Sequence, residues 1–209
     1  MKDVILYIHG KGGSAAESEH YRPLFPGRDV IGLDYQSFTP WETGAEIRSA
    51  VESLKPEYEN IILIANSIGA YFSMNAEIGG MISRAYFVSP IVDMERLITE
   101  MMVWANVTEE QLEAEGVIAA GFDEDLSWEY LCYVRGHPVK WEVPTEILYG
   151  SRDNLTFTIL NTPQKTICDT AFQIFIAGII KIIKTIGRKL IHRRIIKIDE
   201  LLQVLIFII

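Results

Sequence analysis

Five short apolar runs alternate along the first 150 residues with segments of mixed polarity. Aliphatic and β-branched residues dominate each run, and turn-forming or polar residues follow it, which is typical of buried β-strands. Strands that are apolar throughout belong inside a parallel sheet covered on both faces. The pattern therefore predicts strands over residues 3–10, 29–35, 60–66, 84–90 and 143–150.

Helical patterns fill the gaps between these runs. Residues 39–42 (TPWE) have the spacing of a capping box with proline at the first helical position, and they predict a helix to about Lys55. A second helix is expected over about residues 67–76. The alternation predicts an α/β fold with a doubly wound, mainly parallel sheet, in which ligands bind beyond the carboxyl ends of the strands.

Residues 91–140 interrupt the alternation and are too long for a simple connection. Residues 108–111 (TEEQ) form a second capping box, and aromatic residues recur near helical spacing in residues 127–134. We expect a helical insertion above the sheet, in the position of a lid. Surface helices with a packed aromatic face would give the same pattern. The aromatic residues of the insertion include Trp104, Trp128 and Tyr130. They suit the binding of an apolar substrate, although packing in a core explains them equally well.

Composition narrows the class of protein. The chain has 209 residues, which suits one domain, and its formal net charge of −9 disfavours a nucleic-acid binder. Cys132 and Cys168 have neither a metal-binding nor a redox spacing. The apolar stretch at the start of the chain is too short for a secretory signal, and lysines break the longest apolar segments near the other end. We therefore expect a cytoplasmic protein without a transmembrane span.

The composition changes abruptly after residue 156. Residues 157–209 hold sixteen isoleucines and a net charge of +5, whereas the first 156 residues carry −14 and every Trp and Tyr. We therefore divide the chain into a core at 1–156, with the insertion at about 91–140, and an atypical Ile/Lys-rich segment at 157–209. The mixture of isoleucine with Lys and Arg resembles a basic amphipathic segment, which could contact an anionic membrane peripherally.

The third run leads into Ala65-Asn66-Ser67-Ile68-Gly69, which has the pattern of a nucleophile elbow. Such an elbow holds a serine on a strained turn between strand and helix, and small residues two before and two after it avoid clashes. The alternative is an ordinary turn with Ser67 as a helix N-cap. The first run ends in residues 9–14 (HGKGGS), whose glycines favour an oxyanion loop, because the spacing of a phosphate-binding loop is absent.

Together these motifs resemble the α/β-hydrolase superfamily, and within it a small bacterial serine hydrolase. The resemblance covers about residues 3–156 and includes the late strand followed by Gly-Ser-Arg-Asp. It implies that Ser67 is the nucleophile, that the backbone N–H groups of Lys11 and Ile68 form the oxyanion hole, and that Asp153 is the triad acid. Ala65 in place of the usual first glycine is a mild departure that also occurs in the superfamily.

Two parts of the implied triad have competitors. Asp153 could instead stabilise a turn, and Asp34 and Asp93 also follow strands. His192 is the only histidine after Asp153, but it lies 39 residues later among basic residues that would depress its pKa, so an incidental role fits it better. The remaining histidines fit other roles. The resemblance implies a structural role for His9 in the His-Gly pair, His20 is expected on a surface helix, and His137 precedes the last strand, where the family order does not place the base.

The sequence therefore predicts an esterase-like serine hydrolase that cleaves an ester or related acyl substrate through an acyl-enzyme on Ser67. The catalytic histidine is not securely present. The alternatives are a catalytically silent hydrolase-fold binding protein and an acyltransferase. We expect a small-molecule acyl substrate, and neither a metal nor an organic cofactor, since no ligand cluster or dinucleotide fingerprint occurs. The sequence does not indicate an oligomeric state.

Three explanations fit the segment after residue 156: a shifted reading frame, a replacement module, or a divergent but working C-terminal half with His192 as the base. We favour the first, and the coding DNA tests it. One of the other two frames past codon 156 should encode a strand and then a glycine-flanked histidine. If neither frame does, this explanation is wrong.

Overall fold

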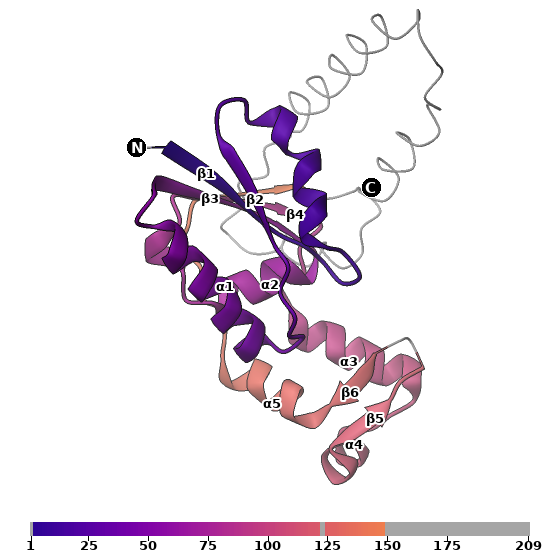
Figure 1. Cartoon of the computed structure of the whole chain (residues 1–209). Helices are drawn as coiled ribbons and strands as arrows, with labels where there is room; N and C mark the ends of the chain where they lie inside the picture. Colours follow the sequence, from indigo (N-terminus) through magenta and orange to yellow (C-terminus); the bar gives the residue numbers. More distant parts are fainter. Residues whose placement is uncertain (1, 122–123, 149–209) are drawn as a thin grey trace, which may run out of the picture.

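The computed structural model describes residues 2–121 and 124–148 (Figure 1). Its centre is a five-stranded parallel sheet with strand order β2-β1-β3-β4-β7. Every strand predicted from the sequence is present, so the mainly parallel α/β architecture is confirmed. Asp153, His192 and the segment 157–209 lie outside the described residues. The strands are β1 Lys2–Ile8, β2 Asp29–Leu33, β3 Tyr58–Asn66, β4 Arg84–Val88 and β7 Thr145–Leu148.

The central strands are buried on both faces, which explains why their sequences are apolar throughout. In β1, Leu6 and its alternate neighbours pack into the larger core, while Ile5 and Tyr7 pack into a smaller one on the opposite face. β1 and β3 pair in register, with Leu6 opposite Leu63. Side chains of a strand alternate between faces, so one strand supplies both cores.

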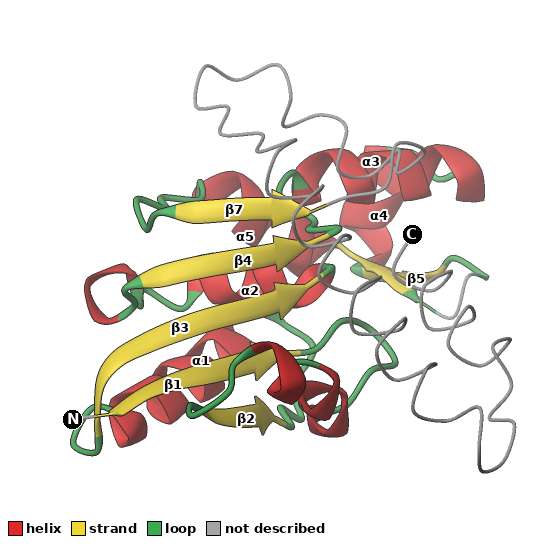
Figure 2. Ribbon diagram, turned by 90° about the horizontal axis from the view of Figure 1, so that it is seen from above, coloured by secondary structure: helices red, strands yellow, loops and turns green. Residues whose placement is uncertain are grey.

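Helices α1 (Pro40–Leu54) and α2 (Ile68–Asn75) cover one face of the sheet (Figure 2). The predicted capping box at the start of α1 forms only in part. The Thr39 hydroxyl accepts a hydrogen bond from the Glu42 backbone N–H at 3.3 Å. The Glu42 carboxylate accepts from that hydroxyl at 2.8 Å rather than from the Thr39 backbone. Proline at the first helical position still favours this start.

Two short 3-10 helices, η1 (Ala15–His20) and η2 (Arg22–Leu24), cover part of the opposite face. Tyr21 and Phe25, which flank η2, pack against the smaller core. His20 ends η1 and is exposed, as expected for a surface helix. Helices this short leave little periodicity in a sequence, so the pattern did not reveal this cover. A third, η3 (Gly79–Met81), precedes β4.

The insertion at residues 91–140 is mainly helical, as expected. The capping box predicted at residues 108–111 is complete. The Thr108 hydroxyl accepts a hydrogen bond from the Gln111 backbone N–H, and the Gln111 side chain accepts one from the Thr108 backbone N–H. A small antiparallel hairpin lies between the helices and was not predicted. The elements are α3 Met94–Ala105, α4 Glu109–Glu115, β5 Val117–Ala119, β6 Asp125–Ser127 and α5 Trp128–Gly136.

Ion pairs and aromatic contacts hold the insertion together and join it to the core. The Arg135 guanidinium on α5 donates to Glu95 at 2.7 Å and to Glu109 at 2.6 and 2.9 Å, which links α3, α4 and α5. Trp41 of α1 contacts the rings of Tyr130 and Tyr133 on α5, with centroids 6.0 and 4.9 Å apart. The insertion therefore packs on the face that carries α1 and α2.

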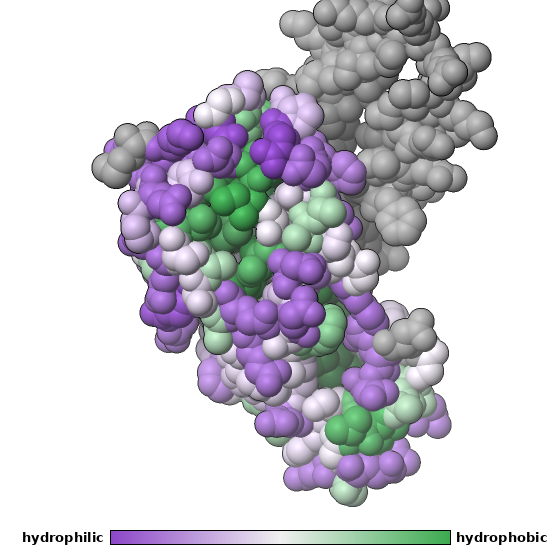
Figure 3. Space-filling view, viewed as in Figure 1, coloured by the Kyte–Doolittle hydropathy of each residue, from purple (hydrophilic) through white to green (hydrophobic). Residues whose placement is uncertain are grey.

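On the face of the insertion that Figure 3 shows, apolar residues gather near β5 among mainly polar ones. Val117 of β5 is exposed, as are Val103 and Trp104 of α3. Among the residues that the structure describes, no helix has the length and apolar character needed to cross a membrane.

Shortening Leu63 tests the core at its most enclosed point. Leu63 lies on the central strand β3 and is 0% exposed. Leu63→Ala should lower the free energy of unfolding by about 2–5 kcal/mol, because transfer energy is lost and a cavity forms. Urea unfolding followed by circular dichroism measures this change. Glu57→Ala, at an exposed position before β3, should change the same quantity by less than about 0.5 kcal/mol.

Candidate active site

Ser67 lies at the turn between β3 and α2, where its backbone has φ 52° and ψ −121°. A positive φ is uncommon for a residue other than glycine and costs of order 1–3 kcal/mol. Surrounding contacts hold the turn in place. The Ser67 N–H donates to the Val88 carbonyl at 2.9 Å, and the Ser67 carbonyl accepts from the N–H groups of Ala70 and Ile91, both at 3.1 Å.

The Ser67 side chain does not cap the helix that follows it. An N-cap residue has an extended backbone and accepts from the second or third N–H of the helix, whereas Ser67 has a positive φ and makes no such side-chain bond. The residue is partly exposed. Its hydroxyl is therefore positioned beside the start of α2 without the structural task that an ordinary turn would give it.

Gly69 lets α2 approach the end of β1 very closely. A Cβ atom at residue 69 would lie 2.3 Å from the His9 carbonyl oxygen and 2.9 Å from that of Ile8. Real Cβ atoms do not approach oxygen this closely, so any other residue would push the helix away from the strand. At residue 10, a Cβ atom would lie 3.1 Å from the Ser67 Cβ atom. These two glycines bring the serine and the loop after β1 together.

The loop after β1 forms a tight turn beside Ser67. The Gly13 N–H donates to the Gly10 carbonyl at 3.1 Å, and Gly12 has φ +69°. Lys11 occupies the position before Gly12 and does not have a positive φ, which matches a type II turn. Ile68 is the first residue of α2 on the other side of the serine. Ser67 therefore lies between the start of α2, at Ile68, and the loop that contains Lys11.

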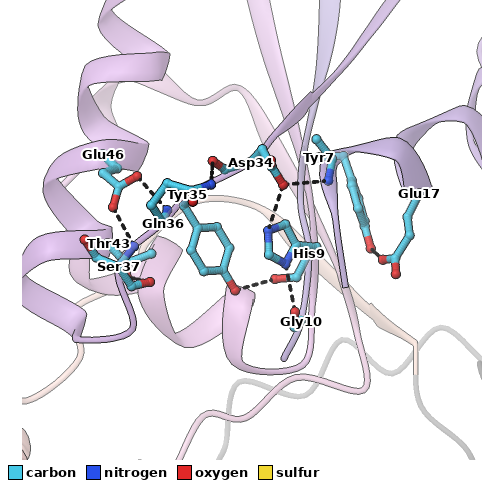
Figure 4. A network of polar contacts seen from close by, with 11 residues as sticks. Tyr7, His9, Gly10, Glu17, Asp34, Tyr35, Gln36, Ser37, Thr43 and Glu46 are labelled. Carbon is cyan, nitrogen blue, oxygen red and sulfur yellow. Dashed lines mark hydrogen bonds and ion pairs between the residues drawn. The ribbon is translucent and has the colours of Figure 1, made fainter. Parts of the chain in front are cut away.

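A polar and aromatic network holds this loop from behind (Figure 4). The His9 ring is stacked on Tyr35, with centroids 4.1 Å apart, and its Nδ1 lies 2.8 Å from the Gly10 carbonyl oxygen. The Tyr35 hydroxyl donates to the His9 carbonyl at 3.1 Å. Burial raises the pKa of Tyr35 to about 12, so it remains a neutral donor at ordinary pH.

The other ring nitrogen of His9 faces Asp34, whose carboxylate lies 3.9 Å from Nε2. The ring is buried, with Nδ1 toward the Gly10 carbonyl and Nε2 toward Asp34. These contacts fit the structural role that the resemblance implies for His9. Asp34 also approaches the Ala15 N–H at 3.4 Å, which places it at the rim of the same network.

Two carboxylates, Glu17 and Glu46, form hydrogen bonds with β1 and with the chain after β2. Glu17 accepts from the Tyr7 hydroxyl at 2.5 Å. Glu46 of α1 accepts from the backbone N–H groups of Gln36 and Ser37, both at 2.9 Å, and so fixes the chain after β2. Burial alone would raise the pKa of Glu46, but hydrogen bonds from Ser37 and Gln36 outweigh it, and the pKa is lowered.

The structure describes two of the other residues that the sequence analysis considered for the triad, Asp93 and His137. Asp93 caps α3, with its carboxylate accepting from the Arg96 backbone N–H at 3.0 Å, so it has a structural task. His137 is exposed at the end of α5 and stacks on Tyr133. Asp153 and His192 lie outside the described residues, and their roles stay predictions. Within residues 2–121 and 124–148, no three His, Cys, Asp or Glu side chains form a group that could hold a metal ion.

The structure adds two features that the sequence did not reveal. The Lys11 ammonium pairs with Glu124 of the insertion at 2.6 Å, which joins the loop after β1 to the segment before β6. Tyr71 of α2 and Tyr130 of α5 bury their hydroxyls without a hydrogen-bond partner. The first feature joins residues from distant parts of the sequence and the second depends on burial, and no local motif marks either.

Comparisons with known proteins agree with the fold. No family model matches the chain. A Mycoplasma genitalium protein named esterase/lipase 3 is 30% identical over an alignment of 103 positions, which covers 43% of this chain and 37% of that protein. The chain thus spans well under half of that relative. Mouse alpha/beta hydrolase domain-containing protein 10 has a TM-score of 0.56 at 15% identity, covering 88% of this chain and 90% of its own. Bacillus licheniformis lipase BlEst2 has a TM-score of 0.48 at 17% identity, covering 70% and 64%.

Gly69→Ala tests the close approach of α2 to β1. The new Cβ atom must displace backbone atoms of β1, so we expect a loss of about 1–3 kcal/mol in the free energy of unfolding. Chemical denaturation measures this loss. The matched control is Gly44→Ala in α1, where a Cβ atom would meet nothing nearer than 3.4 Å. This control should be neutral or stabilising by up to about 1 kcal/mol, and equal losses in both variants would contradict the interpretation.

Proposed function

We propose that this chain, which has the α/β-hydrolase fold, is a serine hydrolase that cleaves a carboxylic ester or related acyl substrate. Ser67 is the nucleophile. The backbone N–H groups of Lys11 and Ile68 stabilise the oxyanion. The proposal concerns residues 1–156, and residues 91–140 act as a lid over the site.

The observation that carries this proposal is the position of Ser67. Its backbone has φ 52°, its side chain caps nothing, and the loop after β1 lies against it. A strained serine between a buried strand and a helix is a recurrent solution for presenting a hydroxyl at the edge of a parallel sheet. The positive end of the helix dipole favours negative charge beside it.

The proposed reaction has two steps. The Ser67 oxygen attacks the carbonyl carbon and gives its proton to a base, and the carbonyl oxygen becomes an anion held by the two N–H groups. The intermediate then expels the alcohol, which takes the proton, and leaves an acyl-enzyme. Water attacks that acyl-enzyme in the same way and releases the acid. An acyltransferase would use the same groups and replace water by another acceptor.

A general base completes this scheme, and His9 is already used to hold the loop. We propose Asp153 as the acid that orients the base, in keeping with the order Ser, Asp, His along the chain. His192 is the candidate base. The likeness to a protein named as an esterase or lipase supports the ester substrate class, and the sheet topology supports the position of the site at the carboxyl ends of the strands.

A fluorophosphonate probe tests the proposed nucleophile directly. Such a probe reacts with a serine only when a base and an oxyanion hole activate it. We expect one label per chain at Ser67, located by peptide mass mapping. Ser67→Ala should abolish labelling, and His192→Ala should slow it at least about 100-fold if that histidine is the base.

Folding must be checked in parallel by circular dichroism. Labelling of a folded chain at another residue would contradict the assignment of Ser67. If the folded chain takes no label at all, the elbow exists without a working triad. The protein would then be a catalytically silent binding protein of this fold.

A second pair of variants tests the oxyanion hole. Lys11 occupies the second position of a tight turn, where proline is well tolerated, so Lys11→Pro removes the N–H donor with little effect on the turn. The labelling rate should fall about 100- to 1000-fold, the effect of losing one oxyanion donor. Lys11→Met removes the ion pair with Glu124 but keeps the N–H, and its rate should stay within a few-fold of the unmodified chain.

A further inference from the structure

The Glu17 carboxylate lies against Gly13, the last residue of the turn after β1. A Cβ atom at residue 13 would lie 2.9 and 3.0 Å from the two carboxylate oxygens of Glu17, and 3.1 Å from the His9 Cβ atom. The backbone of Gly13 is not in the left-handed region, so the lack of space favours glycine here, and not the backbone conformation. Gly13 is therefore packed against both Glu17 and His9.

The Tyr7 hydroxyl holds this carboxylate in place. Tyr7 is on β1, is 1% exposed and packs its ring against Tyr21, with centroids 5.1 Å apart. Its hydroxyl donates to Glu17 Oε2 at 2.5 Å (Figure 4). Burial, and after it the bond to Glu17, raises the pKa of Tyr7 well above its usual range, so the phenol stays protonated and donates at neutral pH. A buried side chain of the sheet therefore fixes the Glu17 carboxylate.

The chain between the turn and Glu17 is also fixed to the sheet. A Cβ atom at residue 32 of β2 would lie 2.1 Å from the Ala15 carbonyl oxygen, so the backbone of Ala15 rests directly on Gly32. The Glu17 N–H donates to the Ser14 carbonyl at 3.1 Å, at the start of η1. The backbone of this segment is thus held against β2, while the Glu17 side chain returns to contact Gly13, four residues earlier.

The position of Gly13 affects the proposed oxyanion donor. The turn begins at Gly10, which lies against Ser67, and ends at Gly13, whose N–H donates to the Gly10 carbonyl at 3.1 Å. Lys11 is the second residue of this turn, so a shift of either end changes the direction of its N–H. Three of the four residues of the turn are glycine, which restricts the backbone least. Contacts from outside the turn must therefore hold it in one conformation.

We propose that Glu17 is a positioning residue for the oxyanion hole: its carboxylate, fixed by the Tyr7 hydroxyl, holds Gly13 and thereby sets the direction of the Lys11 N–H. Glu17 does not touch the substrate and acts only through the turn. Its position matters and its charge does not, because a negative charge beside the hole would by itself oppose an oxyanion. The inference rests on the proposed function, since it assumes that the Lys11 N–H stabilises the oxyanion at Ser67.

Backbone NMR of the full chain tests whether Glu17 orders the turn, and it requires no activity. Amide nitrogen relaxation should give order parameters near about 0.85 for residues 11–13 of the unmodified chain, and values below about 0.6 in Glu17→Ala. Tyr7→Phe removes the hydroxyl, still fills the core and should have the same effect. Glu17→Gln keeps an acceptor for Tyr7 and should leave the turn ordered. Glu19→Ala is the matched control, because Glu19 is also on η1 but is exposed and pairs with Arg22 at 2.6 Å.

Labelling rates test whether this order serves the oxyanion hole. Glu17→Ala should slow fluorophosphonate labelling at Ser67 at least about tenfold, since a small misplacement of a reacting group costs this much or more. Glu17→Gln should restore the rate to within about threefold. In a Lys11→Pro chain, which lacks the N–H, Glu17→Ala should slow labelling no more than about twofold further, because two residues that act through one group are not additive. Circular dichroism confirms that each variant is folded.

Three results would overturn the inference: an ordered turn in both Glu17→Ala and Tyr7→Phe, a Glu17→Gln chain as slow as Glu17→Ala, or losses from Glu17→Ala and Lys11→Pro that multiply in full. A purely structural role, in which Glu17 only pairs the buried phenol, predicts the first of these. The unmodified chain judges the proposed function separately. If it labels at Ser67 but does not depend on Glu17, the function stands and only this assignment fails. If it is folded and takes no label, the function fails, and the oxyanion role of the turn fails with it.

Discussion

The close contact between the first turn of α2 and the end of β1 is the constraint on which the rest of the site depends. A Cβ atom at residue 69 would lie 2.3 Å from the His9 carbonyl oxygen, so only glycine permits this spacing. The contact places the start of a helix, a strained serine and a glycine-rich turn at one point on the edge of the sheet. The backbone cost at Ser67 is sustained because β3, β4 and α2 fix the turn through backbone hydrogen bonds.

The site divides its tasks between backbone and side chains. The groups proposed to stabilise charge are backbone N–H groups on a loop and a helix, both fixed to the sheet. The histidine and tyrosine behind the loop act as supports: His9 stacks on Tyr35, and the Tyr35 hydroxyl donates to the His9 carbonyl. Preorganised donors of this kind need no rearrangement when charge develops, which is why such sites are built on rigid elements.

The insertion combines internal contacts with contacts to the core. Arg135 links its three helices, so it holds its own shape, and it meets the core through Trp41 and through the pair between Lys11 and Glu124. That pair is partly exposed, and such pairs contribute little to stability. The aromatic part of this interface is formed by Trp41 of α1 with Tyr130 and Tyr133 of α5.

Local patterns were enough to predict the strands, the main helices, the parallel sheet and the candidate nucleophile, because apolar runs, capping residues and the small residues around Ser67 act over short stretches of chain. The contacts between elements add that His9 is held between Tyr35 and Asp34, and that Lys11 pairs with Glu124 of the insertion. Those relations join residues from different elements, and burial and distance, which no local pattern encodes, determine them. The 3-10 cover and the β5–β6 hairpin escaped prediction because each is too short to show a period.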